Sequence, residues 1–182
     1  MAVIRAALPA DAGAIAAIEV ETWRTAYAGI LPDAMLLGLD PARRRQSWGR
    51  TVRYDPGDAV IATEDGGVVG FGSCGRQPLT ALPYSGEIFT LYVLPDRQNQ
   101  GTGRLLLAAL FERLVGLGQT SALVWVLSDN PSRYFYERMG ARWVANRPIP
   151  VWRGQSVDAA GYGWTDLRAV LERRGQMPSR IG

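Results

Sequence analysis

Hydrophobic and polar positions change their period several times along the chain, and these changes predict an alternation of strands and helices. Residues 3–7 form a short extended run that Pro9 ends. From Asp11 onward the apolar residues recur at the spacing of a helix with one buried face. Residues 34–39 and a segment that opens at Pro41 are predicted as two further helices, because proline is favoured at the first helical position.

The pattern then alternates with a period of two, which is typical of strands. Residues 58–63 and 68–75 are predicted to form a hairpin around an acidic, glycine-containing turn, and residues 87–94 form the next strand. An amphipathic helix is predicted over residues 101–117. Four leucines are expected on its buried face: Leu106, Leu110, Leu114 and Leu117.

The remaining segments complete a mixed sheet. Residues 122–127 are almost continuously apolar, as in a buried parallel strand, and residues 131–139 are predicted as a short helix. Residues 142–151 and 161–167 are expected to pair as strands. The fold class is therefore α/β, with one mixed sheet of about six to seven strands and helices on both faces. We expect a single domain over residues 1–170 and a C-terminal tail over 171–182.

Residue types that are absent exclude much of enzyme chemistry. The 182 residues contain no histidine, and all twenty basic residues are arginine. Catalysis by a Ser-His-Asp triad, an imidazole metal site and a lysine-dependent phosphate loop are therefore excluded. The single cysteine, Cys74, allows neither an intramolecular disulfide nor a thiolate metal cluster. We expect Cys74 to be a small buried apolar residue and the protein to use no metal.

The net charge of +3 and a pI near 9.3 favour an anionic ligand. The arginines are scattered, which argues against nucleic acid as a partner. No apolar stretch approaches the roughly 20 residues that span a bilayer, and the N-terminus does not resemble a signal peptide. We therefore expect a cytoplasmic protein that does not bind membranes, and its alanine-rich, lysine-free composition suggests a GC-rich bacterial genome.

One loop carries most of the predicted chemistry. Residues 98–104 join the end of a buried strand to the start of a helix, and Gly101 and Gly103 let the backbone pass close to a ligand. The N-terminus of a helix attracts anions such as pyrophosphate, and Arg104 adds a permanent cation. The third glycine of a dinucleotide-binding loop is missing. An ordinary strand–helix turn is the alternative interpretation.

Two blocks of sequence resemble the GNAT superfamily of N-acetyltransferases. Residues 91–106 combine a hydrophobic strand, a proline, a Gln-x-x-Gly-x-Gly loop and an apolar helix, as in the acetyl-coenzyme A site of that family. Residues 130–140, which contain Asn, Phe-Tyr-Glu and Gly, resemble its second block. Two departures are Ala141, where the family usually has an aromatic residue, and the short distance from Asn130 to Tyr136, six positions later.

The resemblance implies direct transfer of an acetyl group from acetyl-CoA to a primary amine in a ternary complex. It also implies that the backbone of residues 91–93 pairs with the pantetheine arm and that backbone N–H groups of residues 99–104 donate to the pyrophosphate. The side-chain amide of Asn130, in the second block, would hydrogen-bond the pantetheine. The residues implied in cofactor binding are Leu91, Tyr92, Val93, Gln98, Asn99, Gln100, Gly101, Thr102, Gly103, Arg104 and Asn130. The side chains at 91–93 are equally expected in the core, and Asn130 equally as a helix cap. Dimerisation through the last strands is common in the family, so a homodimer is a further expectation.

Two residues are candidates for proton transfer. The resemblance implies that Tyr136 protonates the departing thiolate, with Tyr134 as the competing phenol. Glu87 is the candidate base, because no histidine exists and its strand carries the acetyl group. Alternation along that strand predicts that Glu87 lies on the same face as Phe89, Leu91 and Val93, and a surface carboxylate at a strand end is the alternative. The aromatic residues of the first helices are expected to wall the acceptor cleft but are not assigned as site residues. Two other functions remain open: a non-catalytic acyl-CoA-binding module and a nucleic-acid-binding protein.

Overall fold

The computed structural model of the chain describes residues 1–55, 58–78, 82–152 and 154–175. Its centre is a seven-stranded sheet in the order β1-β2-β3-β4-β5-β7-β6. The strands are β1 (Val3–Ala6), β2 (Ala59–Glu64), β3 (Gly67–Arg76), β4 (Gly86–Val93), β5 (Ala122–Leu127), β6 (Arg142–Trp152) and β7 (Gln155–Trp164). The helices are α1 (Ala12–Ala26), α2 (Asp33–Leu37), α3 (Pro41–Tyr54), α4 (Thr102–Gly116), α5 (Arg133–Arg138) and α6 (Leu167–Gly175), with short 3-10 turns η1 (Pro9–Asp11) and η2 (Pro95–Arg97).

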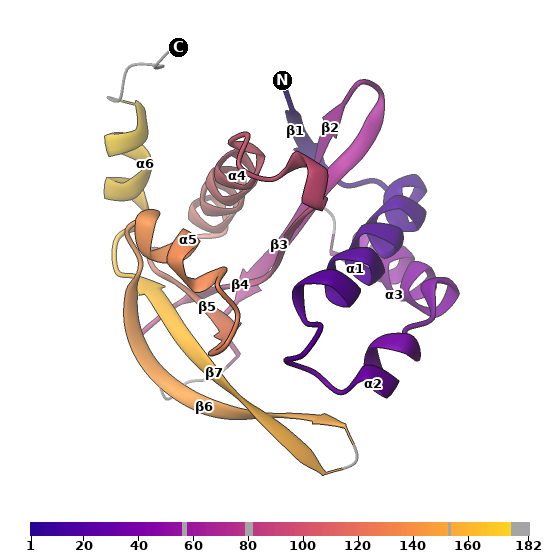
Figure 1. Ribbon diagram of the computed structural model, residues 1–182. Coiled ribbons are helices and arrows are strands. Elements are labelled where there is room, and N and C mark those ends of the chain that lie inside the picture. The colour runs from indigo at the N-terminus through magenta and orange to yellow at the C-terminus, as the bar shows by residue number, and fades with distance from the viewer. Residues whose placement is uncertain (56–57, 79–81, 153, 176–182) are drawn as a thin grey trace.

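Helices cover both faces of the sheet, as predicted. Helices α1 and α3 lie on one face, where they share a buried cluster with β2 and β3, and α4 lies on the other (Figure 1). All neighbouring strands are antiparallel except β4 and β5, which run parallel on either side of α4 in the sequence. The mixed α/β sheet with one parallel β–α–β unit is therefore confirmed.

The last part of the chain differs from the prediction. Strand β7 begins at Gln155, six positions before the expected 161, and ends at Trp164, and Leu167 opens helix α6 instead of ending a strand. The segment contains Asp158 and several glycines, which are poor strand formers, but β6 supplies a complete ladder for it across a turn at Gly154 with φ of 79°. Helix α6 crosses the predicted start of the tail, and residues 176–182 of that tail lie outside the described residues.

Helix α4 sits unusually close to the sheet because its leucines rest on glycines. A Cβ added at Gly70 would lie 3.2 Å from Leu106 Cδ1, and one at Gly72 would lie 2.7 Å from Leu110 Cδ1. These two leucines and Leu114 are fully buried, as predicted. Leu117 is 41% exposed, so its predicted place on the buried face is wrong; it is the C-cap residue, where the helix has already ended.

Strands β4 and β5 separate soon after they meet. They pair at Gly86, Glu87 and Ile88 and at no later described position. A register shift between β3 and β4 leaves Phe89 as a bulge, because Ser73 pairs with Thr90 while Cys74 pairs with Ile88. Beyond the bulge, the edge of β4 that faces β5 has no strand partner. None of the helices in the described ranges is long and apolar enough to span a membrane.

Candidate active site

The edge of β4 opposite β3 is the first component of the site. From Phe89 to Val93 this edge is unpaired, because β5 has already diverged. Such an edge offers backbone donors and acceptors to an extended, amide-containing ligand, in the way that a peptide adds a strand to a sheet. Leu91 and Val93 turn their side chains into the α4 face of the core, and Tyr92 packs with the α1 and α3 cluster, so the backbone is what remains for a ligand.

The loop after β4 is shaped to receive an anion. Asn99 and Gly101 have φ values of 60° and 89°, in the left-handed region that turns the backbone sharply before α4. Gly101 is the N-cap of α4 and provides no side-chain cap, so the N–H groups of the first turn have no side-chain acceptor. Uncapped donors and the positive end of the helix dipole together make an anion site. Thr102 is buried beneath this turn.

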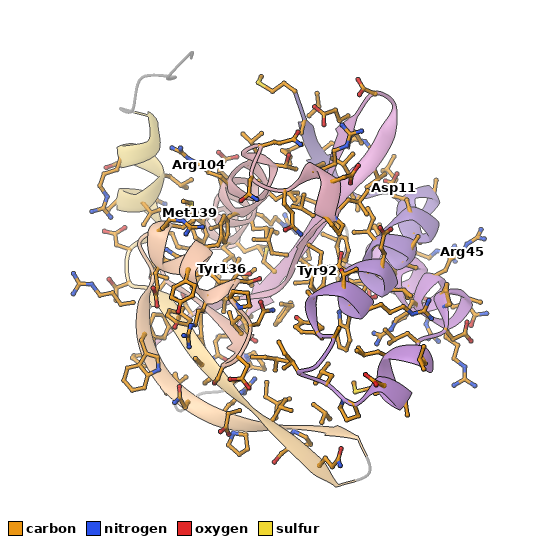
Figure 2. All side chains as sticks on the ribbon, viewed as in Figure 1. Asp11, Arg45, Tyr92, Arg104, Tyr136 and Met139 are labelled. Atoms are coloured by element: carbon orange, nitrogen blue, oxygen red, sulfur yellow. The ribbon has the colours of Figure 1, made fainter. Side chains whose placement is uncertain are left out.

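The other residues of the loop have separate tasks. The side-chain amide of Gln98 donates to the carbonyl of Val93 (3.0 Å), and that of Gln100 donates to the carbonyl of Asp96 (3.0 Å). Both glutamines therefore brace the loop with their side chains and offer a ligand only their backbone. A Cβ at Gly103 would make ordinary contact with Phe135 and Val93, at 3.6 and 3.9 Å. Arg104, on the first turn of α4, is partly exposed (Figure 2).

A network of hydroxyl and amide groups spans the two diverging strands. The indole N–H of Trp23 donates to the hydroxyl of Tyr92 on β4 (3.0 Å). Burial raises the pKa of Tyr27, and hydrogen bonds to its hydroxyl from Tyr92 and Asn130 act in the opposite direction. Asn130 follows β5, so Tyr27 links the two sides of the gap. Tyr27 is one of the aromatic residues of the first helices that are expected from the sequence at the acceptor cleft without being assigned to the site, and only the fold brings the end of α1 to this gap.

Asn130 holds the turn after β5. Its side-chain oxygen accepts a hydrogen bond from the backbone N–H of Ser132 (2.9 Å). The side chain is 5% exposed. The expectation that Asn130 is the N-cap of the helix is wrong, because α5 begins at Arg133 and its N-cap is Ser132; Asn130 instead holds the turn that precedes the helix. The same side chain also interacts with the hydroxyl group of Tyr27.

Tyr136 is the phenol that the fold buries. Its ring packs edge-on against Phe135 and Trp164, and its hydroxyl has no hydrogen bond to any residue in the described part of the chain. Burial, followed by the nearby Tyr27, raises the pKa of Tyr136 above its ordinary value, so the phenol keeps its proton. Tyr134 is 48% exposed and accepts a hydrogen bond from Arg133 (2.9 Å). Of the two phenols, Tyr136 is therefore the buried one and Tyr134 the exposed one.

Glu87 is buried, which rules out its alternative interpretation as a surface carboxylate. The residue is 8% exposed, and its Oε2 atom is buried without a partner in the described residues. Burial raises the pKa of Glu87, and the charge of Arg147 lowers it. The prediction that Glu87 shares a face with Leu91 and Val93 is wrong, because the bulge at Phe89 reverses the alternation. Glu87 instead faces the α1 side of the sheet.

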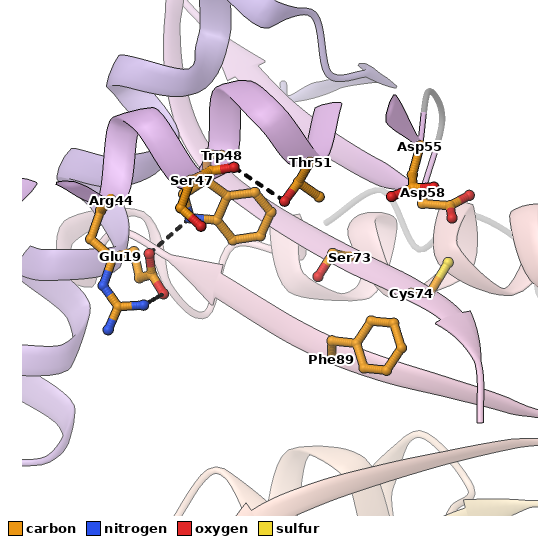
Figure 3. Close-up of a pocket in the computed structure, with 10 residues that line it drawn as sticks. All are labelled: Glu19, Arg44, Ser47, Trp48, Thr51, Asp55, Asp58, Ser73, Cys74 and Phe89. Atoms are coloured by element: carbon orange, nitrogen blue, oxygen red, sulfur yellow. Dashed lines mark hydrogen bonds and ion pairs between the residues drawn. The ribbon is translucent and has the colours of Figure 1, made fainter. Parts of the chain in front are cut away.

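A small pocket lies on that same side, between α1, α3 and the strands β3 and β4 (Figure 3). Its volume is about 190 Å³, and Phe89 and Ser73 lie along the sheet side of it. Glu19 accepts hydrogen bonds from Trp48 (2.8 Å) and Arg44 (3.3 Å) at its opposite wall. Residues of the first helices therefore line this pocket. The pocket also reaches Cys74.

Cys74 has the structural role that its sequence context predicted. It is 1% exposed, and its thiol donates to the carbonyl of Leu110 at 3.7 Å. Burial raises the pKa of this thiol to about 12. A protonated thiol at neutral pH is a poor nucleophile.

Comparison with known proteins agrees with this geometry. Residues 17–141 match the model of the acetyltransferase (GNAT) family. The chain is 36% identical, over 171 residues, to the uncharacterized N-acetyltransferase YuaI of Bacillus subtilis (strain 168), and the match covers 93% of this chain and 96% of that protein.

Solved structures share the fold at lower identity. The acetyltransferase yncA of Salmonella typhimurium, solved with acetyl-CoA, superposes with a TM-score of 0.69 at 24% identity, covering 91% of this chain and 94% of that one. The ribosomal-protein-alanine N-acetyltransferase of Brucella melitensis gives a TM-score of 0.72 at 23% identity, with 90% and 99% covered. By its sequence match, and with a fold in agreement, the chain belongs to the acetyltransferase (GNAT) family and is an acyltransferase.

Proposed function

We propose that this protein transfers an acetyl group from acetyl-CoA directly to the amine of an acceptor bound beside it. The observation that carries the proposal is the uncapped N-terminus of α4, which follows directly on the unpaired edge of β4. An extended amide chain that ends in a pyrophosphate matches these two features in order.

The donor would lie along β4 and end at α4. The backbone of Leu91–Val93 would pair with the pantetheine arm, and the N–H groups of residues 99–104 would bind the pyrophosphate. Arg104 would add a cation beside the phosphates. Asn130, whose side chain also interacts with the hydroxyl group of Tyr27, would contact the pantetheine from the β5 side. A backbone N–H near Val93 would stabilise the negative charge that develops on the thioester oxygen.

The transfer would need one base and one acid. Glu87 would accept a proton from the ammonium group of the acceptor. Burial raises the pKa of the Glu87 carboxyl group toward the pKa of an amine, which makes this proton transfer less unfavourable. The neutral nitrogen attacks the thioester carbon, so that a C–N bond forms and the C–S bond breaks with its electrons on sulfur. Tyr136 would then give its phenolic proton to the thiolate. The attacking nitrogen would lose its second proton to the phenolate, which restores Tyr136, and Glu87 would release its proton to water.

The cofactor site can be tested at Gly103. A Cβ there makes ordinary contacts and needs no unusual φ, so substitution does not strain the loop as it would at Gly101. Gly103→Asp places a carboxylate beside the phosphates, and Gly103→Asn is the uncharged control of the same shape. We expect acetyl-CoA to bind the wild type with a micromolar Kd by titration calorimetry, Gly103→Asn to bind less tightly, and Gly103→Asp to lose at least about another tenfold. Absence of binding by the wild type, or equal losses in both variants, would refute the proposed cofactor site.

A further inference from the structure

Three side chains far apart in the sequence share one face of the sheet beside the point where β4 and β5 diverge. Glu87 lies on β4, Trp125 on β5 and Arg147 on β6. Trp125 is paired across the ladder with Gly161, and Arg147 with Ala159, both on β7. The small residues of β7 leave room for the Arg147 side chain to cross that strand. Its guanidinium carbon lies 4.0 Å from the centre of the Trp125 ring.

Each of these three side chains has a buried polar atom without a partner in the described residues. The atoms are Oε2 of Glu87, Nε1 of Trp125 and Nε of Arg147. Buried polar atoms in native proteins are nearly always hydrogen-bonded, so three such atoms on one patch of one face indicate a missing partner. The set contains one acceptor with a negative charge, one neutral donor and one donor with a positive charge.

The two opposite charges lie near each other but do not meet. Arg147 acts on the ionisation of Glu87 through its charge, yet no ion pair joins them within the described ranges of the chain. The ring of Trp125 leans toward β7, where a Cβ added at Gly161 would lie 3.1 Å from Cζ3, and the guanidinium stacks on that ring. Strand β5 therefore lies between the two charges, and a small molecule that carries both an ammonium group and an anion would bridge this gap.

We infer that the acceptor is a free amine that also carries a carboxylate, and that Arg147 binds this carboxylate while Glu87 faces the amine. The guanidinium would hold the carboxylate in a charge-assisted hydrogen bond through Nε and a terminal nitrogen. The indole N–H of Trp125 is a further donor for the anion. The last paired residue of β4 is Ile88, directly after Glu87, so the amine would stand at the opening through which the thioester is reached.

This inference rests on the proposed function and narrows it to a substrate class. A peptide or protein terminus has no carboxylate near its amine, and a polyamine has none at all. Both would leave the buried Nε atom of Arg147 without a hydrogen-bond acceptor, which is unfavourable. A free amino acid or a compound of the same charge pattern satisfies all three orphaned atoms.

The test compares free acids with their amides. Thiol release from acetyl-CoA is measured with the standard L-amino acids and with the C-terminal amide of each one, in the wild type and in Arg147→Gln. Arg147→Lys retains the charge without the planar fork. Arg142→Gln is the matched control, because Arg142 lies on the same strand but is exposed. Thermal melting checks that every variant folds.

We expect accepted acids to have a kcat/KM at least about tenfold above that of their amides, as one charge-assisted contact implies. Arg147→Gln should raise KM for the acid by a similar factor and leave KM for the amide unchanged, while Arg147→Lys falls between and Arg142→Gln behaves as wild type. The inference would be overturned by equal rates with acids and amides, or by an equal loss for both in Arg147→Gln. It would also be overturned if no acid reacts and none binds to the acetyl-CoA complex by calorimetry. Titration with acetyl-CoA alone separates the two proposals: if the wild type does not bind it, the proposed function fails first.

Discussion

The packing of α4 on glycines makes a quantitative prediction about Leu110 and Gly72. Leu110 is fully buried, so Leu110→Ala should destabilise the protein by about 3–5 kcal/mol through lost burial and a residual cavity. Gly72→Ala should cost about 1–3 kcal/mol by overpacking, because the new Cβ would lie 2.7 Å from Leu110 Cδ1 and 3.1 Å from the carbonyl of Thr90. In the double variant the first of these contacts disappears and the added methyl group enters the cavity.

The two changes should therefore compensate each other in part. We expect the double variant to be more stable than the sum of the single costs by about 1–2 kcal/mol. Urea unfolding followed by circular dichroism measures this coupling, provided that the slope m stays constant across the set. Leu117→Ala is the control on the same helix, because Leu117 is 41% exposed and should cost little. Strictly additive costs for Leu110 and Gly72 would show that the helix does not rest on this glycine.

Three further predictions concern single side chains. Tyr136→Phe should lower kcat by about a hundredfold or more while the calorimetric Kd for acetyl-CoA stays the same, and an unchanged kcat would exclude Tyr136 as the acid. Glu87→Gln should remove activity yet raise the melting temperature near pH 8. The pKa of Glu87 is raised in the folded state, so the wild type loses stability as the pH rises through that pKa. The melting temperatures of wild type and variant should converge at low pH, and a lower melting temperature of the variant at pH 8 would contradict this. Asp11→Asn should cost about 1 kcal/mol at pH 7, a value reduced by the exposure of Arg5, because Arg5 and the N–H of Leu8 both bond to the carboxylate at 2.7 Å. Since the hydrogen bond from Arg5 lowers the pKa of Asp11, this cost should vanish as pH falls below the lowered value, and a cost independent of pH would contradict the assignment.

The best sequence-based predictions concern segments whose partners are close along the chain. The loop at residues 98–104 has its glycine, its helix start and its preceding strand within a few positions, so the local pattern contains most of the geometry. The leucines of α4 were placed correctly up to Leu114 for the same reason. Leu117 was misplaced because a helical period does not show where the helix ends.

Predictions that required a register between strands were less accurate. The bulge at Phe89 reverses the faces of β4 beyond it, and it is visible only in the pairing of β4 with β3. The start of β7 was missed because its first residues are poor strand formers that gain their structure from β6. In both cases the backbone conformation depends on hydrogen bonds to a strand that the local sequence does not contain.

The sequence by itself determined the class of the fold and the position of the glycine-containing turn between β4 and α4. It also excluded histidine and lysine chemistry, since residue types that are absent can take no part in a reaction. Only the tertiary structure decided that Glu87 is buried, that Tyr27 links the two strands across the gap, and that Arg147 reaches Trp125. The physical reason is that burial, charge and hydrogen bonding at a site depend on neighbours in space, and these residues come from segments that lie far apart along the chain.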